Sequence, residues 1–248
     1  MTLSLKRRAF LQVWRLAQRG DDRRCPCCAV RVRSFAPYGA SRRPNAQCPG
    51  CGSLERHRAL WLYLRERTEF LGQHIRVLAV APDANLESQA RRQPWDYLSI
   101  DAAGGKAARQ MDLTALELPD GDRDLLIAYH VLEHIIDDGA AMAEIRRVLR
   151  PGGLAMLAVP LGGEESDEQF RDAPPDVRAR EYGQPDHVRL YGRLDFGRRL
   201  RASGLEPQEI RVGDVFDQSA DEFGLLRDDV FFVARPAVAA MVRGAADR

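Results

Sequence analysis

The sequence predicts an α/β fold with a doubly wound, mostly parallel sheet and a small metal-binding module ahead of it. From residue 75 onward, short and nearly uninterrupted apolar runs alternate with segments of helical periodicity. Strands of this kind are typical of a parallel sheet that helices cover on both faces. All five cysteines lie earlier, between residues 25 and 51. The 248 residues are enough for one large domain with a small appendage.

Residues 1–22 are expected to form a basic helix. Phe10, Val13, Trp14 and Ala17 follow the spacing of one helical face, which we expect to dock on the protein's own surface. Residues 1–67 carry a net charge of +11 and the remainder −10, so contact with a nucleic acid or a membrane surface is the alternative. The N-terminal stretch lacks the features of a secretory signal, and no apolar run is long enough to span a membrane. These observations favour a cytoplasmic protein without a membrane partner.

The cysteines predict a structural zinc site. Four of them form two C-x2-C pairs, and each pair can place two thiolates on one turn, which together complete a tetrahedral shell. The expected ligands are Cys25, Cys28, Cys48 and Cys51. Cys27 could replace a neighbour in the first pair, and disulfides or free thiols are the less favoured alternatives. We therefore expect a zinc-ribbon module with a linking helix over residues 23–72.

His57 is a weaker candidate ligand. It belongs to "SLERHRALWLYLRER", which is typical of a helix capped by Ser53. A surface or packing role for His57 is therefore the preferred interpretation.

The larger domain is expected over residues 73–248. Its elements are predicted in order as strand 75–80, helix 85–93, strands 95–100, 110–113 and 125–129, helix 131–149, strand 154–159 and helix 193–202. Residues 161–186 are polar and irregular, which is typical of a lid. "LEPQEIRVGDVF" and "RDDVFFVARP" predict an antiparallel pair at the sheet edge, and the last residues predict a short helix or a frayed end.

Ligands of such sheets bind at the carboxyl ends of the strands. The first strand ends in the turn "APDAN" at 81–85, which has no glycine, whereas dinucleotide sites carry several there. Asn85 tolerates a positive φ and is the expected substitute. Asp101 stands where an acid would bind the hydroxyls of a ribose, although a simple turn aspartate is the alternative.

Residues 124–160 resemble class I S-adenosylmethionine-dependent methyltransferases. The specific parts are "HVLEHI" and "RVLRPGG", and the resemblance covers about residues 75–213. It implies a seven-stranded, Rossmann-like methyltransferase fold. "CPCC…CPGCGSLERHR" resembles a subgroup that carries a zinc ribbon ahead of this fold and an Ala-Pro-acid turn in place of the glycines.

The resemblance implies S-adenosylmethionine as cofactor and assigns its contacts. Asp101 would bind the ribose, Asp112 and Leu113 would flank the adenine, and Tyr129 and His130 would approach the methionine end and the methyl group. The turn that lies close to the bound cofactor would consist of Ala81, Pro82 and Asp83.

Three histidines are candidate bases for the acceptor's proton, namely His187, His130 and His134. His187 lies in "PDHVRLYG", where Arg189 and Tyr191 alternate with it and could contact the acceptor. Anchoring of the next helix is the alternative for this segment, and packing is the alternative for His134.

The expected activity is methyl transfer to a hydroxyl or amine of a small molecule, such as a sugar or a secondary metabolite. The first alternative is an RNA methyltransferase that holds RNA with its basic zinc module. The second is a cofactor-binding relic without activity.

Overall fold

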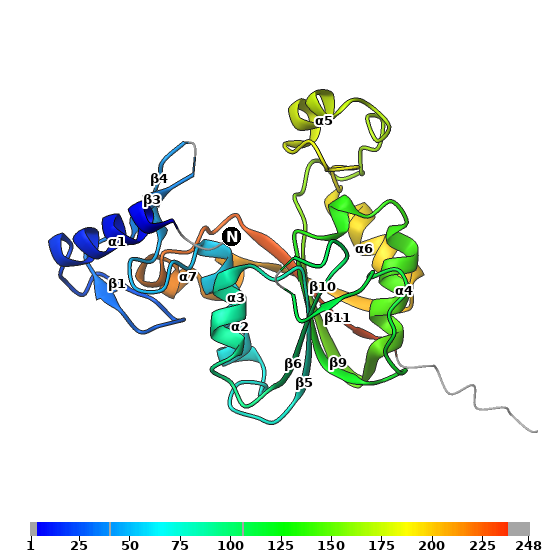
Figure 1. The fold of residues 1–248 in the computed structure, drawn as a ribbon, viewed down its shortest axis with the longest axis horizontal. Helices are drawn as coiled ribbons and strands as arrows, with labels where there is room; N and C mark the ends of the chain where they lie inside the picture. The colour runs from blue at the N-terminus through cyan, green and yellow to red at the C-terminus, as the bar shows by residue number, and fades with distance from the viewer. Residues whose placement is uncertain (1–3, 40, 106, 238–248) are drawn as a thin grey trace, which may run out of the picture.

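The computed structural model describes residues 4–39, 41–105 and 107–237, and Figure 1 shows the small N-terminal module beside the larger sheet domain. The module and its linking helix comprise α1 (Leu5–Ala17), β1 (Arg23–Arg24), β2 (Arg31–Val32), β3 (Ala36–Tyr38), β4 (Arg43–Gln47) and α2 (Glu55–Arg67). The first half of the larger domain comprises β5 (Arg76–Val80), α3 (Ala84–Ala90), β6 (Asp96–Asp101), β7 (Arg109–Gln110), β8 (Arg123–Tyr129) and the 3-10 turn η1 (Leu132–His134). The second half comprises α4 (Asp138–Val148), β9 (Leu149–Ala158), α5 (Pro175–Tyr182), α6 (Arg193–Ala202), β10 (Leu205–Arg211), α7 (Val212–Phe223) and β11 (Val230–Pro236).

Seven strands form the main sheet in the order β10-β11-β9-β8-β5-β6-β7. The pairs from β9 through β7 are parallel, whereas β11 is antiparallel to both β9 and β10. This arrangement confirms the predicted mostly parallel sheet and its antiparallel edge. The carboxyl ends of β5, β6 and β8 therefore meet at one edge of the sheet.

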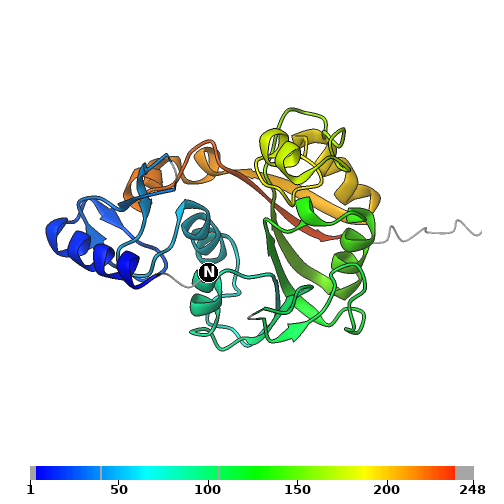
Figure 2. The same ribbon diagram turned by 45° about the horizontal axis from the view of Figure 1, so that its top comes forward.

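Two hydrophobic layers enclose the sheet. Side chains of α2, α3 and α7 pack on one face, and side chains of α4 and α6 pack on the other. Along β5, Val77 and Ala79 belong to the first layer, whereas Leu78 and Val80 belong to the second. Figures 1 and 2 show α2 and α4 on opposite sides of the strands. Burial on both faces explains the uninterrupted apolar sequence of this strand.

Several elements differ from their expected bounds. The helix expected over 131–149 is divided into η1 and α4, because Asp137 accepts a hydrogen bond from Ala140 N at 2.9 Å and starts a new helix there. The polar segment 161–186 contains α5, and α7 lies between the last two strands, where no helix was predicted. The prediction for the chain's end falls on residues 238–248, outside the described residues.

The N-terminal helix was predicted with a partly wrong face. Leu11 is its buried residue, whereas Val13 is 66% exposed and Ala17 is also exposed. The helix is held instead by polar contacts, because Arg7 donates to Gln47 Oε1 at 2.7 Å and Trp14 Nε1 donates to Ser34 O at 3.1 Å. Among the described helices, none has the length and apolarity needed to cross a membrane.

Candidate active site and metal centre

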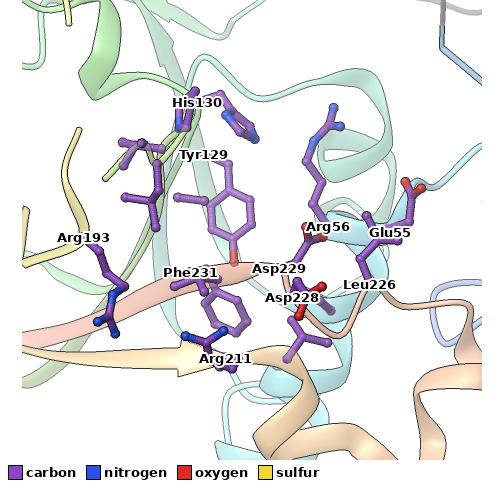
Figure 3. Close-up of a pocket in the computed structure, with 18 of the residues that line it drawn as sticks. Glu55, Arg56, Tyr129, His130, Arg193, Arg211, Leu226, Asp228, Asp229 and Phe231 are labelled. Carbon is purple, nitrogen blue, oxygen red and sulfur yellow. The ribbon is translucent and has the colours of Figure 1, made fainter. Parts of the chain in front are cut away.

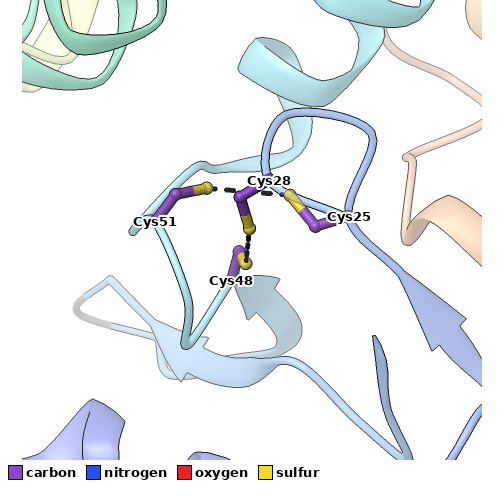
Figure 4. Close-up of side chains that lie close together, drawn as sticks. All are labelled: Cys25, Cys28, Cys48 and Cys51. Atoms are coloured by element: carbon purple, nitrogen blue, oxygen red, sulfur yellow. Dashed lines mark hydrogen bonds between the residues drawn. The ribbon is translucent and has the colours of Figure 1, made fainter. Parts of the chain in front are cut away.

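Four cysteines converge in the N-terminal module (Figure 4). The sulfurs of Cys25, Cys28, Cys48 and Cys51 lie within 4.8 Å of one another. The Sγ atoms of Cys25 and Cys51 are 3.7 Å apart, and those of Cys28 and Cys48 are 3.6 Å apart. Zinc–sulfur bonds of about 2.3 Å in a tetrahedron separate sulfurs by roughly 3.8 Å. The cluster therefore has the size and the ligand chemistry of a structural zinc site.

The remaining candidate ligands point elsewhere. Cys27 Sγ lies 3.9 Å from the carbonyl oxygen of His57 and is not a member of the cluster. His57 accepts a hydrogen bond at Nδ1 from Leu54 N at 3.1 Å. Ser53 was expected to cap α2, but its hydroxyl lies 3.3 Å from the sulfurs of Cys25 and Cys51, and Leu54 takes the capping position.

A buried arginine that the sequence analysis missed joins the module to the larger domain. Arg58 is fully buried and donates to the carbonyl oxygens of Ala46 and Ser53, both at 2.9 Å. It also donates to the carbonyl of Phe223 at 2.7 Å, at the end of α7. The only signal in the sequence was an arginine on the apolar side of a helix, which is also compatible with a long side chain lying along the surface.

The turn after β5 is held by its acid and not by glycine. Asp83 caps α3, because its Oδ1 accepts hydrogen bonds from the backbone N–H groups of Asn85 and Leu86, both at 2.9 Å. Its Oδ2 lies 2.5 Å from Nε2 of His57. Burial alone would raise the pKa of Asp83, but the hydrogen bond from His57, with smaller contributions from Leu86 N and Arg56, holds it well below its usual range.

The positive φ occurs at Ala81 (+44°) and not at Asn85, which lies in α3. This corrects the expectation for Asn85, whose side chain donates instead to the carbonyl of Cys51 at 3.1 Å. His130, at the end of β8, also has a positive φ of +57°. Such conformations cost of order 1 kcal/mol or more in a residue with a side chain, and they cluster at functional sites.

Asp101 and Asp112 lie at the same sheet edge. Asp101 ends β6, is partly exposed, and accepts at Oδ1 from Ala103 N at 2.8 Å. Asp112 is exposed and accepts at Oδ1 from Thr114 N at 2.8 Å, while its neighbour Leu113 is buried. Both carboxylates are therefore positioned by local turns and remain accessible to a ligand.

Two cavities adjoin at the end of β8. The smaller, of about 190 Å³, is lined by the turn Ala81, Pro82 and Asp83 and by residues of α2. The larger, of about 810 Å³, lies between α2, the end of β9 and the approach to β11. Arg56, Tyr129 and His130 line both cavities and form the wall between them.

Charged side chains surround the larger cavity (Figure 3). Its lining includes the acids Glu55, Asp228 and Asp229 and the bases Arg193 and Arg211. Burial, and then the charge of Glu55, raise the pKa of Asp229 to about 6, against smaller opposing contributions from nearby cations. A carboxylate with this pKa can accept a proton near neutral pH.

Tyr129 lines this cavity, and its buried hydroxyl has no hydrogen-bond partner among the described residues. Burial, and then the charge of Asp229, raise the pKa of Tyr129 well above its usual value. The hydroxyl is therefore protonated, buried and without a partner among the described residues. The sequence contained only weak signals for this pair, because Asp229 lies in an edge segment far from the motifs.

The segment after the polar stretch, residues 187–191, lines neither of these two cavities. His187 is buried, with Nδ1 2.8 Å from the carbonyl of Tyr182 and Nε2 4.0 Å from Glu133 Oε1. His134 is partly exposed, and its Nδ1 lies 3.3 Å from Asp186 Oδ2. Neither histidine lines either of these two cavities, whereas His130 lines both.

Arg189 and Tyr191, expected to contact an acceptor, are also buried and line neither cavity. Arg189 donates to Glu168 Oε1 at 2.9 Å and to carbonyls between η1 and α4. The Tyr191 hydroxyl donates to Asp138 Oδ2 at 2.7 Å. Their polar atoms serve the protein's own backbone and carboxylates, which corrects their expected placement at an acceptor.

Residues 50–157 match the family model described as "Methyltransferase domain". An uncharacterised 37.1 kDa protein of transposon Tn4556 from Streptomyces fradiae is 29% identical over 161 residues, which cover 62% of this chain and 44% of that protein. A protein of Mycolicibacterium smegmatis named as a probable S-adenosylmethionine-dependent methyltransferase is 29% identical over 101 residues, which cover 41% of this chain and 35% of that protein. The chain thus spans less than half the length of these curated relatives.

Solved structures share the fold. A chain of the Haloferax volcanii complex between the Trm112 methyltransferase activator and its proposed methyltransferase has a TM-score of 0.52 at 12% identity, covering 74% of this chain and 91% of that one. The Burkholderia thailandensis 1,6-didemethyltoxoflavin N1-methyltransferase, solved with its substrate and S-adenosylhomocysteine, has a TM-score of 0.50 at 15% identity, covering 74% and 78%. At these identities the likeness concerns the fold alone.

Proposed function

We propose that this protein, a class I methyltransferase by its fold and by the family match over residues 50–157, transfers a methyl group from S-adenosylmethionine to a small molecule. The observation that carries the proposal is the pair of adjoining cavities with a common wall of Arg56, Tyr129 and His130. One cavity would hold the methionine end of the cofactor and the other the acceptor. The methyl group would then cross at this wall.

The residues at the sheet edge suit the cofactor. Asp101 and Asp112 offer accessible carboxylates to the ribose hydroxyls and the adenine amine, with Leu113 as apolar support. The methionine end of the cofactor would lie beside the turn of Ala81, Pro82 and Asp83. When bound, the cofactor supplies an electrophilic methyl group, and the protein's part is to align the acceptor with it.

We assign the proton transfer to Asp229 in place of a histidine. A hydroxyl or amine acceptor loses a proton on methylation and needs a base with a pKa near the operating pH. Asp229 meets this need through its cavity position and its raised pKa. Tyr129 would form part of the wall of the acceptor site. The cavity volume of about 810 Å³ lies within the range of small-molecule sites.

The four-cysteine cluster supports a structural zinc ion that folds the N-terminal module. We keep the proposed division into a basic helix (1–22), a zinc module with its linking helix (23–72) and a methyltransferase domain (73–248). The match to the methyltransferase family begins within the second of these, at residue 50. Because α2 also lines both cavities, the module contributes to the proposed active site.

An RNA acceptor is the second candidate, favoured by one surface. Arg15 of α1, Arg19 just after this helix, and Arg31 line a shallow depression on the N-terminal module. Such a surface suits a phosphate backbone.

One experiment distinguishes these acceptors. The protein is incubated with S-adenosylmethionine labelled in its methyl group and with cell extract, which is then separated into metabolite and RNA fractions. Label in a metabolite, lost in the Asp229→Asn variant, supports the proposal. Label in RNA alone replaces it with the second candidate. Cofactor binding by calorimetry without any transfer would identify a relic.

A further inference from the structure

A second cluster of side chains that could hold a metal ion lies next to His130, which lines both cavities. It comprises Glu133 and His134 of η1 and His187 of the loop after α5, and each offers one ligand atom within 4.8 Å of the others. Glu133 is fully buried, and His187 is 3% exposed. Within the described chain, neither carboxylate oxygen of Glu133 nor Nε2 of His187 has a hydrogen-bond partner.

The hydrogen bond of His187 Nδ1 determines whether Nε2 carries a proton or a lone pair. Nδ1 lies 2.8 Å from the carbonyl oxygen of Tyr182, and a carbonyl can only accept, so Nδ1 carries the proton. In the neutral ring Nε2 then presents a lone pair. It faces the Glu133 carboxylate, which also presents lone pairs, at 4.0 Å. Two buried acceptors that face each other without a donor are costly unless a cation lies between them.

The spacing and surroundings fit a metal ion. A separation of 4.0 Å exceeds a hydrogen bond and is wider than the roughly 3.4 Å between two ligands that each lie about 2.1 Å from a tetrahedral ion, so the two side chains would move a few tenths of an ångström closer when the ion binds. Histidine ligands of metals donate their second nitrogen to a carbonyl or a carboxylate. His187 does so to Tyr182, and His134 has Nδ1 3.3 Å from Asp186 Oδ2.

We propose that Glu133, His134 and His187 bind a divalent transition-metal ion, distinct from the four-cysteine zinc site. Two imidazoles and one carboxylate suit first-row ions such as Zn²⁺ or Mn²⁺ and leave coordination positions open. The site joins η1, at the end of β8, to the loop after α5. It also lies next to the cavity wall, because His130 Nδ1 is 3.3 Å from Glu133 Oε1. The proposal does not depend on methyl transfer.

The test measures metal binding without cofactor or acceptor. The full-length protein is treated with a mild chelator that spares tightly bound zinc, and the residual zinc is counted by mass spectrometry. It is then titrated with Mn²⁺ alone, with free Mn²⁺ followed by electron paramagnetic resonance, and separately with Zn²⁺ alone by calorimetry. We expect one additional equivalent of either ion, and a melting temperature that rises with metal concentration.

The Glu133→Gln and His187→Gln variants should lose at least tenfold in affinity for the added ion and lose the metal-dependent rise in melting temperature. Glu69→Gln, which changes an exposed carboxylate on the loop after α2, is the matched control and should bind as the wild type does. If the two buried variants do not fold, His134→Ala removes a partly exposed ligand and should show the same loss. Absence of an additional equivalent in the wild type, or unchanged affinity in folded variants, would overturn the proposal.

Discussion

Nε2 of His57 lies 2.5 Å from Oδ2 of Asp83, and this contact joins α2 to the turn that follows β5. Because Nδ1 of His57 accepts the N–H of Leu54, Nε2 carries the proton and donates it to the carboxylate. Asp83 in turn caps α3. The module that holds the cysteines and the turn that would hold the cofactor are therefore one hydrogen-bonded unit.

Removing the histidine should destabilise this unit. We expect His57→Ala to lower the free energy of unfolding by about 1–2 kcal/mol, the lower part of the range for a hydrogen bond to a charged group, because Asp83 is 35% exposed. The pKa of Asp83 is lowered on folding, so its stabilisation is present above the unfolded pKa and is lost as the pH falls toward the folded one. The difference between wild type and variant should therefore shrink in acid. Denaturant unfolding from pH 3 to 7 measures it, with the exposed His74→Ala as control.

The proposed zinc site predicts different effects for the replacement of Cys48, a ligand, and of Cys27, which is not a ligand. Cys48→Ser should lose the metal and unfold the N-terminal module, because a structural zinc site supplies much of the folding free energy of so small a unit. Cofactor affinity should weaken without being abolished. Cys27→Ser should keep one zinc per chain, since its sulfur lies outside the cluster. Metal analysis and circular dichroism of both variants check this, and equal zinc content in the two would exclude the assigned ligand set.

Cofactor binding should depend on the carboxyl end of β6. Asp101→Ala is expected to weaken S-adenosylmethionine binding by roughly 1.5–3 kcal/mol, the range for losing hydrogen bonds to a charged group. Asp96→Ala makes the same change at the opposite end of the same strand, where the side chain is exposed, and should leave affinity unchanged. Isothermal calorimetry compares the three proteins. A wild type that binds no cofactor at millimolar concentration would contradict the proposed function as a whole.

The sequence predicted the sheet well because burial on both faces of β5, β8 and β9 leaves uninterrupted apolar runs. It predicted the cysteine cluster because two C-x2-C pairs are a local signal. The candidate acceptor site was less accessible to sequence analysis. Tyr129 and Asp229 are one hundred residues apart, and only the antiparallel return of β11 beside β9 brings the second to the first.

Local patterns also misled at particular positions. Asn85 was expected at positive φ because its side chain tolerates that region, but Asp83 starts α3 at once and places Asn85 in the helix, so the bend falls on Ala81. Val13 fits an apolar helical face by spacing, yet it is exposed. There, tertiary contacts of Arg7 and Trp14 determine the orientation of the helix, and periodicity alone does not contain them.

The pH dependence of turnover should report on Asp229. The base must be deprotonated to accept a proton, so turnover should rise with pH through about 6, the raised pKa of this carboxyl group. Asp229→Asn should lower turnover by about 10²–10⁴-fold and remove this acidic limb, with cofactor affinity nearly unchanged. The exposed Asp172→Asn serves as the control for charge. An acidic limb that persists in Asp229→Asn would assign the base to another group.

Replacing Arg189 tests whether this residue stabilises the fold or binds the acceptor. Its side chain is 1% exposed, and it donates to the carbonyls of Leu132 and Ile136 and to the carboxylate of Glu168. Arg189→Met should destabilise the protein by about 2–4 kcal/mol, because it leaves the buried carbonyls of Leu132 and Ile136 without a donor and removes one of the two cations beside Glu168. Arg189→Lys should recover little of this loss, since an ammonium cannot reproduce the fork of the guanidinium.

Thermal unfolding and steady-state kinetics together decide the question. If Arg189 bound an anionic group of the acceptor, its replacement would raise KM while stability stayed unchanged. The structure predicts the opposite result, in which the melting temperature of Arg189→Met falls strongly. Below that temperature, KM for the acceptor should change little, because the side chain lines neither cavity. A stable Arg189→Met protein with a raised KM would return this residue to the acceptor site.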